Sequence, residues 1–281
     1  MSHVTPDDYV LGRSAEEYAR LTLQARIARP YTERYFRAAG LGPGMRVLDL
    51  GSGMGDVAML AADIVGPGGH VHGIDVDPKV LEHARRRTVD YGCAPWVTFE
   101  PADIDAFVTA DRFDALVGRF VLLYLPDPAA TVRHLLESVK PGGIVVFHDV
   151  DLSHPHYSYP SSPLWDCGCQ LVRDAFDRAG TPLNAGLRLG NIFVRAGLPF
   201  PTLVSEGAIG GGRASGLYPW LATTVASVAP RLDGLGLALP PALVPFETLA
   251  ERLEEEAIRL GSQVAASTQY AAWTRKPLHL S

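Results

Sequence analysis

Five short apolar runs, each followed by a helical pattern, constrain this chain more than any other feature of its sequence. They lie between about residues 45 and 150. Short apolar runs bounded by glycine and proline predict buried strands, and their alternation with helices predicts a parallel sheet covered by helices. The short linkers predict right-handed crossovers and an open, twisted sheet. The five expected strands are 45–50, 70–75, 96–100, 113–117 and 144–147.

The helices of this region are marked by their ends. Asp77-Pro78 and Asp127-Pro128 each place a capping carboxylate before a proline, which fits the first position of a helix. A further helix is expected before the first strand, with Pro30 interrupting it midway. The expected helices cover 14–39, 56–65, 78–91 and a segment from 128 to just before 140.

After residue 150 the alternation stops. The patterns predict helices over 164–179 and 191–196, a strand over 201–209, and a long strand or strand pair over 263–276. An insertion carrying Tyr218 and Trp220 separates the last two strands. We expect four parts: a helical cap over 1–40, an α/β core over 41–209, a helical cap over 210–260 and a final core strand over 261–281.

Composition narrows the possible partners. The net charge of the 281 residues is −6 and there is no basic run, which argues against a nucleic-acid-binding protein. The sequence has no apolar stretch of 18 residues and no apolar N-terminal run, so neither a membrane span nor a signal peptide is expected. Three cysteines suit a reducing compartment better than a disulfide scaffold. We therefore expect a cytoplasmic protein.

The segment 47–56 (VLDLGSGMGD) is the most informative about chemistry, because it predicts a strand, a tight glycine loop and a helix start. Glycines let the backbone approach a ligand, and a helix N-terminus offers free N–H groups. The loop reads G-x-G-x-G, with Asp56 where a dinucleotide-binding loop has its last glycine, so a phosphate would be repelled there. Asp49, two residues before the first glycine, suits a cationic ligand.

Two more acidic residues follow the next strands. Asp75 ends the second strand, where a carboxylate can accept hydrogen bonds from both hydroxyls of a ribose, although NAD sites use the same device. Asp103 follows the third strand and could accept the exocyclic amine of an adenine. Val76 and Ile104 would then lie on the two faces of the adenine ring.

Taken in order, these motifs resemble those of class I S-adenosylmethionine (SAM)-dependent methyltransferases. The glycine loop is similar to the first motif of that family. The second to fifth motifs correspond to 73–75 (GID), 101–103 (PAD), 113–114 (FD) and 140–143 (KPGG). The resemblance covers about residues 41–150. It implies an α/β, Rossmann-like, seven-stranded mixed sheet of order 3-2-1-4-5-7-6, with 201–209 as strand six and 263–276 as an antiparallel strand seven.

The resemblance also implies how the chain would hold SAM and its product S-adenosylhomocysteine (SAH). The loop 51–53 would pack on the methionine moiety, and Arg119 would pair with the SAM carboxylate or serve the structure. The stretch 9–24 is similar to a bacterial subgroup acting on small molecules, whose N-terminal helices cover the SAM pocket. The expected cofactor contacts are Tyr18, Gln24, Asp49, Gly51, Ser52, Gly53, Asp75, Val76, Asp103, Ile104 and Arg119.

Two residues after the fifth strand are candidates for catalysis. His148 directly follows the apolar run 144–147 and Asp149 comes next, at the strand end where ligands bind in open α/β folds. A histidine is a natural base for a hydroxyl or an amine, and Asp149 could orient that group by accepting its hydrogen bond. Because side chains alternate along a strand, one of the two should face the acceptor. We expect no metal site, since the segment lacks the Asp-Asn pair of metal-dependent catechol methyltransferases.

These observations predict an enzyme that moves the methyl group of SAM to an oxygen, nitrogen or carbon of a small organic acceptor, in natural-product biosynthesis. A homodimer is its candidate assembly. Two alternatives stay open. One is a SAM-binding enzyme of the same fold that catalyses a non-methyl reaction such as cyclisation. The other is an NAD-type oxidoreductase, against which the G-x-G-x-G loop and Asp56 argue.

Overall fold

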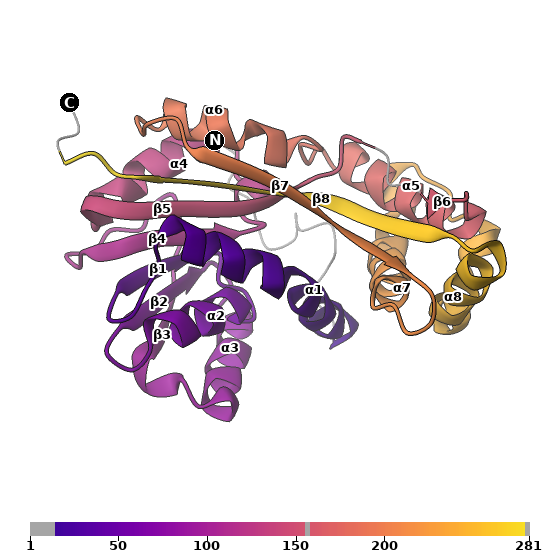
Figure 1. Cartoon of the computed structure of the whole chain (residues 1–281), viewed down its shortest axis with the longest axis horizontal. Coiled ribbons are helices and arrows are strands. Elements are labelled where there is room, and N and C mark those ends of the chain that lie inside the picture. The colour runs from indigo at the N-terminus through magenta and orange to yellow at the C-terminus, as the bar shows by residue number, and fades with distance from the viewer. Residues whose placement is uncertain (1–14, 155–157, 279–281) are drawn as a thin grey trace.

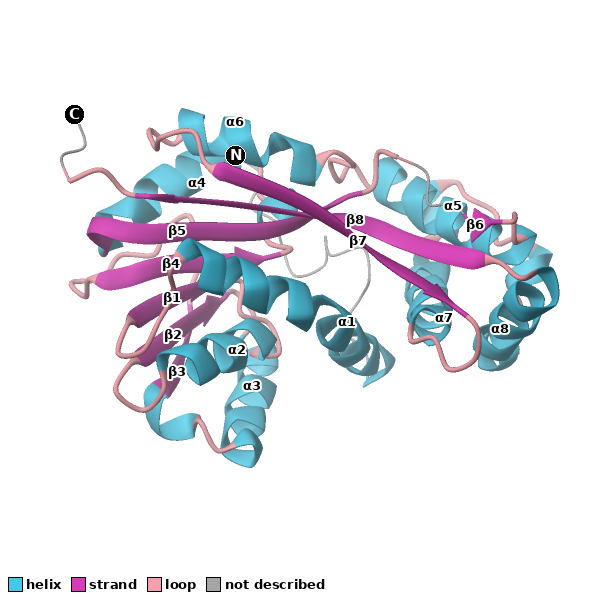
Figure 2. Ribbon diagram, viewed as in Figure 1, coloured by secondary structure: helices cyan, strands magenta, loops and turns pink. Residues whose placement is uncertain are grey.

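A computed structural model describes residues 15–154 and 158–278. They form one mixed sheet with helices on both faces, and the last two strands of the chain extend into a helical lobe (Figures 1 and 2). The strands are β1 Arg46–Leu50, β2 His70–Asp75, β3 Val97–Pro101, β4 Phe113–Arg119, β5 Val139–Asp151, β6 Ser158–Tyr159, β7 Thr202–Gly211 and β8 Gln263–Arg275. The helices are α1 Ala15–Ala39, α2 Asp56–Val65, α3 Pro78–Tyr91, α4 Pro128–Leu135, α5 Pro163–Arg178, α6 Ala185–Arg195, α7 Leu217–Val228 and α8 Leu249–Leu260.

The predicted strand order is confirmed. The sheet runs β3-β2-β1-β4-β5-β8-β6, and β7 pairs with β8. With β7 as the expected strand six and β8 as strand seven, this is the order 3-2-1-4-5-7-6, and β8 is antiparallel to both β5 and β7. The sheet also holds the two-residue β6, which is too short to leave a sequence signal.

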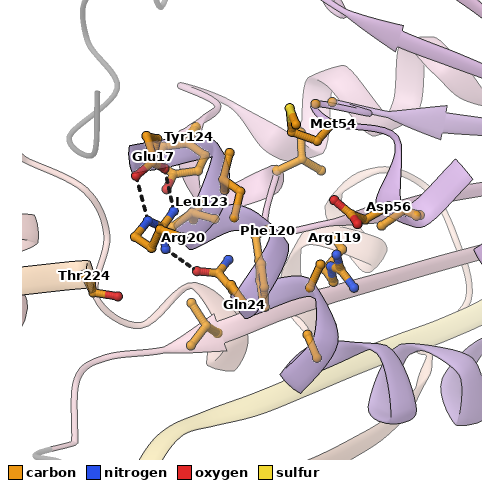
Figure 3. A pocket seen from close by; sticks show the side chains of 18 of the residues that line it. Glu17, Arg20, Gln24, Met54, Asp56, Arg119, Phe120, Leu123, Tyr124 and Thr224 are labelled. Carbon is orange, nitrogen blue, oxygen red and sulfur yellow. Dashed lines mark hydrogen bonds and ion pairs between the residues drawn. The ribbon is translucent and has the colours of Figure 1, made fainter. Parts of the chain in front are cut away.

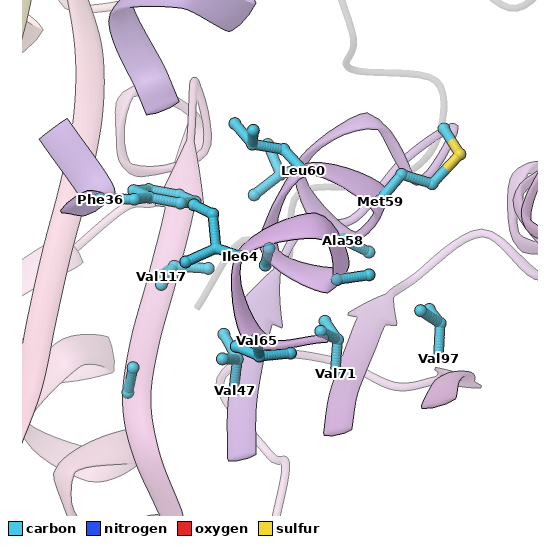
Figure 4. Packing of buried hydrophobic residues seen from close by; sticks show 14 of the residues in the cluster. Phe36, Val47, Ala58, Met59, Leu60, Ile64, Val65, Val71, Val97 and Val117 are labelled. Carbon is cyan, nitrogen blue, oxygen red and sulfur yellow. The ribbon is translucent and has the colours of Figure 1, made fainter. Parts of the chain in front are cut away.

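Both faces of the central sheet are buried, which explains why its strands are continuous apolar runs. Val47 and Val71 point to the side covered by α2 and α3, as Figure 4 shows, whereas Leu48 packs in a second cluster with α4 and α6. The helix ends follow the capping signals. Asp77 accepts a hydrogen bond from the Lys79 N–H at 2.9 Å, and Asp127 accepts one from the N–H of Ala130 at 3.2 Å.

Two local expectations are wrong. Pro30 does not interrupt the first helix, because α1 continues through it with the exposed proline on its outer side. Helices tolerate such a residue where the bend faces solvent and the buried face remains packed. The fifth strand is also much longer than 144–147. It includes the KPGG turn and runs to Asp151, because β8 pairs with it from Ile144↔Arg275 to Asp151↔Thr268.

The helical lobe is built around the far ends of β7 and β8. Helices α5, α7 and α8 share one apolar cluster there, and α1 packs against α7. Trp165 and Tyr218 are both fully buried in this cluster, with their rings edge to face at 6.3 Å. The insertion therefore shares its core with α5 and lies beside the N-terminal helix. No helix in the described ranges is long and apolar enough to span a membrane.

Candidate functional site

A cavity of about 570 Å³ lies at the carboxyl ends of the parallel strands, between α1 and the helical lobe. This volume is typical of sites for small ligands. Part of its lining is drawn in Figure 3. The predicted residues that line it are Tyr18, Gln24, Gly51, Ser52, Gly53, Asp75, Val76, Asp103, Ile104 and Arg119.

The glycine loop and Asp75 hold one another in place. Gly51 has φ 60°, and a Cβ on it would lie 2.7 Å from the Val121 side chain, so no other residue fits there without strain. The N–H of Gly53 donates to Oδ2 of Asp75 at 2.9 Å, and the N–H of Asp77 donates to Oδ1 at 3.0 Å. The Asp75 carboxylate is thereby fixed between the loop and the start of α3, at the wall of the cavity.

Asp56 does not act as the sequence alone suggested. Its two carboxylate oxygens accept hydrogen bonds from the Arg87 guanidinium at 2.7 and 3.0 Å, and Arg87 also donates to the Met54 carbonyl at 2.6 Å. The charge of Asp56 is therefore largely balanced. It therefore repels a phosphate less strongly than an unpaired carboxylate would. The G-x-G-x-G pattern of the loop is then the stronger argument against a dinucleotide ligand.

Asp49 is fully buried beneath the loop and does not line the cavity. Within the described part of the chain, neither oxygen of its carboxylate has a hydrogen-bond partner. Desolvation raises the pKa of Asp49 to about 7, although the nearby Ser52 hydroxyl and, less strongly, the Arg119 charge act to lower it. A buried carboxylate without a partner is destabilised when ionised, and a nearby cation relieves that cost. This position therefore fits a positively charged ligand.

We expect SAM binding to release protons from Asp49. With a pKa near 7, about half of the Asp49 side chains are protonated at pH 7, and the cationic ligand favours the ionised form. Calorimetry at pH 7 in two buffers of different ionisation enthalpy should show release of up to about half a proton. SAH, which lacks the sulfonium charge, should release less. Equal release by Asp49→Asn would contradict this assignment.

Arg119 supplies a positive charge to the cavity wall (Figure 3). Its Nη1 donates to Oγ1 of Thr32 at 3.2 Å, and its guanidinium lies 5.6 Å from the ring centroid of Phe120. Among the residues that the structure describes, no carboxylate lies within ion-pair distance of it. Desolvation lowers the pKa of Arg119, but arginine remains a cation at neutral pH. The guanidinium is thus suited to a ligand carboxylate.

The N-terminal part of α1 carries a cluster of hydrogen-bonded polar side chains that the sequence did not reveal in full. The Arg20 guanidinium binds both oxygens of Glu17 at 2.6 and 2.7 Å, and its Nη1 donates to Oε1 of Gln24 at 2.6 Å (Figure 3). From α7, the Ser227 hydroxyl donates to Glu17 at 2.6 Å. Gln24 lines the cavity as expected, with its carbonyl turned to Arg20. The available signal was the spacing on the helix, with opposite charges at i and i+3 (Glu17 and Arg20) and an amide four residues after the arginine.

His148 and Asp149 do not lie where the sequence placed them. Because β5 continues to Asp151, both lie within the strand, close to its carboxyl end, 1% exposed, and neither lines the cavity. Neither side chain therefore contacts a ligand through the cavity wall. Their roles in catalysis stay a prediction.

Burial also changes the protonation of these two residues. It lowers the pKa of His148 to about 3, with the Arg119 charge as a second cause. It raises the pKa of Asp149 to about 7, against hydrogen bonds from the N–H groups of Val150 and Leu123. At neutral pH His148 is therefore a neutral hydrogen-bonding group. Its Nδ1 lies 2.9 Å from Oγ1 of Thr32, and its Nε2 lies 2.9 Å from Oε1 of Gln269.

A lowered pKa makes His148 a source of acid instability. A histidine in the unfolded chain has a pKa near 6.5, so folding with a value near 3 loses stability as the pH falls below 6.5. In urea unfolding, the stability of wild type relative to His148→Gln should fall by about 1 kcal/mol from pH 6.5 to 5.5, and by at least as much over the next unit. A constant difference would show that His148 titrates normally.

Among the described residues, no three histidine, cysteine, aspartate or glutamate side chains gather as a metal ion would require. Trp220 lines the cavity, whereas Trp165 and Tyr218 belong to the core.

Known proteins are similar in sequence to the part of this chain that contains the glycine loop. Residues 41–176 match a family model described as a methyltransferase domain. The ubiquinone/menaquinone biosynthesis C-methyltransferase UbiE of Ectopseudomonas mendocina is 34% identical over 127 residues, which are 45% of this chain and 47% of the relative. The chain spans about half the length of the curated relatives it matches first.

Solved structures share the fold. A candidate methyltransferase of Bacillus halodurans aligns with a TM-score of 0.57 at 17% identity, covering 87% of this chain and 97% of that one. The [4+2]-cyclase SpnF aligns with a TM-score of 0.54 at 20% identity, covering 90% and 82%. At this level of identity the likeness concerns the fold alone. The sequence match to the model of a methyltransferase domain covers residues 41–176.

Proposed function

We propose that this chain transfers the methyl group of SAM to a small organic acceptor. The observation that carries the proposal is the distribution of charge around the glycine loop. The buried carboxylate of Asp49 suits the positive charges of SAM, and Arg119 suits its single carboxylate. Asp75 and Asp103 line the same cavity, where the resemblance places the ribose and the adenine.

When bound, SAM supplies a sulfonium methyl group that is already activated toward a nucleophile. The residues of the chain therefore need to bind, orient and exclude water, which can supply much of the rate. The loop 51–53 approaches the ligand with its backbone, while Tyr18 and Gln24 of α1 close the cavity from the opposite side. Trp220 and Leu221 of α7 line the cavity from the helical lobe, where water exclusion and acceptor choice would be decided.

One observation favours a second candidate, a non-methyl reaction such as cyclisation. The charged residues that line the cavity come from α1 and from the carboxyl ends of β1 to β4 with the segments after them, and His148 is buried and neutral. A rearrangement that needs no base would suit such a site. Natural-product biosynthesis, a cytoplasmic location and a homodimer remain predictions from the sequence.

The test combines binding with product analysis. Calorimetry should show that SAM and SAH bind and that NAD does not; preferential binding of NAD would refute the proposal. Acceptor candidates from small-molecule extracts are then incubated with the protein and SAM carrying a labelled methyl group. Mass spectrometry that finds one labelled methyl group in a product supports transfer. A product formed only with SAM present but without the label identifies the non-methyl reaction.

A further inference from the structure

The charged groups of the cavity are confined to one side. All the charged lining residues that the structure describes belong to α1, to the carboxyl ends of β2 and β4, or to the segments that follow β1, β2, β3 and β4. The remaining wall, supplied by β5, α5, β7, α7 and β8, is here called the acceptor half. Within the described residues it has no charged side chain, and its surface includes Val172, Phe176, Trp220 and Leu221.

This wall limits what can bind there. An ion that leaves water for an apolar wall loses its hydration, and no countercharge in the acceptor half would replace it. An apolar surface, by contrast, gains free energy in proportion to the area removed from water. A bound molecule is therefore expected to be uncharged and mostly apolar, with few polar atoms to satisfy.

Gln269 of β8 is the amide in this wall, and its orientation follows from its neighbours. Its Nε2 lies 2.8 Å from the Ser267 carbonyl, which can only accept, so the amide nitrogen donates there. Its Oε1 therefore faces His148 Nε2 at 2.9 Å and accepts a hydrogen bond from it. An amide nitrogen has two N–H donors, and one is used for Ser267. The other is available to a ligand.

Further hydrogen bonds lead from His148 to Arg119, on the cofactor side of the cavity. A neutral His148 that donates from Nε2 must accept at Nδ1, and the Thr32 hydroxyl lies 2.9 Å away. The Thr32 hydroxyl also lies within donor distance of the Ala28 carbonyl, at 3.0 Å, so both groups can accept from its one O–H. Its oxygen accepts a hydrogen bond from Arg119 at 3.2 Å. His148 thereby joins Arg119, on the cofactor side, to Gln269 in the acceptor half.

We propose that the acceptor half binds an uncharged, largely apolar molecule whose polar atom accepts a hydrogen bond from the Gln269 amide. His148 is the positioning residue that keeps this amide turned. The proposal rests on the proposed function, because it names the acceptor class for the same cavity. It requires no ionisation of His148 between pH 5 and 9.

The proposal is tested with three naphthalene probes that differ at one substituent, each titrated into the SAH-saturated protein by calorimetry at pH 7. They are 2-naphthol, which is neutral with one polar atom, 2-naphthoate, which is charged, and 2-methylnaphthalene, which has no polar atom. We expect 2-naphthol to bind at least about tenfold more tightly than 2-naphthoate, because of the desolvation cost of the carboxylate. Equal or tighter binding of 2-naphthoate would overturn the proposal.

Gln269→Leu tests the amide itself. It should weaken 2-naphthol binding about three- to tenfold, the usual value of one hydrogen bond, and leave 2-methylnaphthalene unchanged or tighter. The matched control is Gln263→Leu, the same substitution on an exposed position of the same strand, which should change neither. Unchanged 2-naphthol binding in Gln269→Leu would overturn the assignment.

His148→Phe tests positioning. It should reduce the preference for 2-naphthol over 2-methylnaphthalene, as Gln269→Leu does, whereas a merely structural loss would weaken both probes alike and refute the positioning role. SAH affinity is measured first for every protein. If wild type fails to bind SAH, the proposed function fails, while the order of the three probes in the SAH-free protein still decides the acceptor class.

Discussion

Replacing Asp75 with alanine is expected to weaken SAM and SAH binding about tenfold to a hundredfold. The carboxylate is held at the wall of the cavity by the N–H groups of Gly53 and Asp77. The substitution would remove the charge-assisted hydrogen bonds that we propose to the ribose, worth about 1.5–3 kcal/mol, and also the bond to the Gly53 N–H of the glycine loop. Calorimetric titration of SAH measures the loss.

Two comparisons make this result interpretable. Asp90→Ala changes an exposed aspartate near the end of α3 and should leave the affinity for SAH within twofold of wild type. Adenosine and 2′,3′-dideoxyadenosine, which differ only in the ribose hydroxyls, should be distinguished by wild type and not by Asp75→Ala. If Asp75→Ala still prefers adenosine by the wild-type factor, the ribose contact is made elsewhere.

Replacing Arg119 with leucine should weaken the binding of ligands that carry a carboxylate and leave the binding of other ligands nearly unchanged. SAH carries the amino-acid group, whereas 5′-methylthioadenosine has the same nucleoside and sulfur without it. Because the guanidinium has Thr32 and no close carboxylate as its partners among the described residues, we assign it to the ligand. Loss of a charge-assisted pair should weaken SAH binding about tenfold to a hundredfold. Binding of 5′-methylthioadenosine should change little.

The control for this variant is Arg112→Leu, an exposed arginine in the segment before β4. It should bind both ligands as wild type does. If Arg119→Leu weakens both ligands by the same factor, Arg119 serves the structure, which was the other reading of its position. The rise in the unfolding temperature that SAH produces in Arg119→Leu, compared with the rise in wild type, gives an independent measure of the lost affinity for SAH.

The comparison of sequence with structure separates local signals from distant ones. The boundaries of α2, β2 and α3 agree with the expected residue ranges, because each is set by a glycine turn or a capping aspartate within a few residues. The extension of β5 was not foreseeable in the same way. The expected order placed 263–276 beside the fifth strand, but no pattern within 140–151 reveals how far the pairing extends or its register, which joins Ile144 to Arg275.

The same distinction holds in the site. The glycine loop, Asp75 and Asp103 sit directly after strands, and the carboxyl ends of parallel strands meet at one edge, so their order in the chain was enough to bring them together. The ion pair that balances the charge of Asp56 depends on Arg87, which lies 31 residues away on the next helix. Phe120 adopts a φ of 55° beside Arg119 and lines the cavity, a conformation that its sequence context does not announce.

By itself, the sequence determined the strand-and-helix alternation, the glycine loop and the acidic residues around it, because these depend on spacing along the chain. The motifs in that order implied the order of the sheet through their resemblance to a known family. Tertiary structure alone decided which groups are charged and what they face. His148 follows an apolar run and was expected at a strand end. Pairing with β8 buries it beside Gln269, where desolvation keeps it neutral. Burial and pairing arise from segments more than a hundred residues apart, so only the folded chain reveals them.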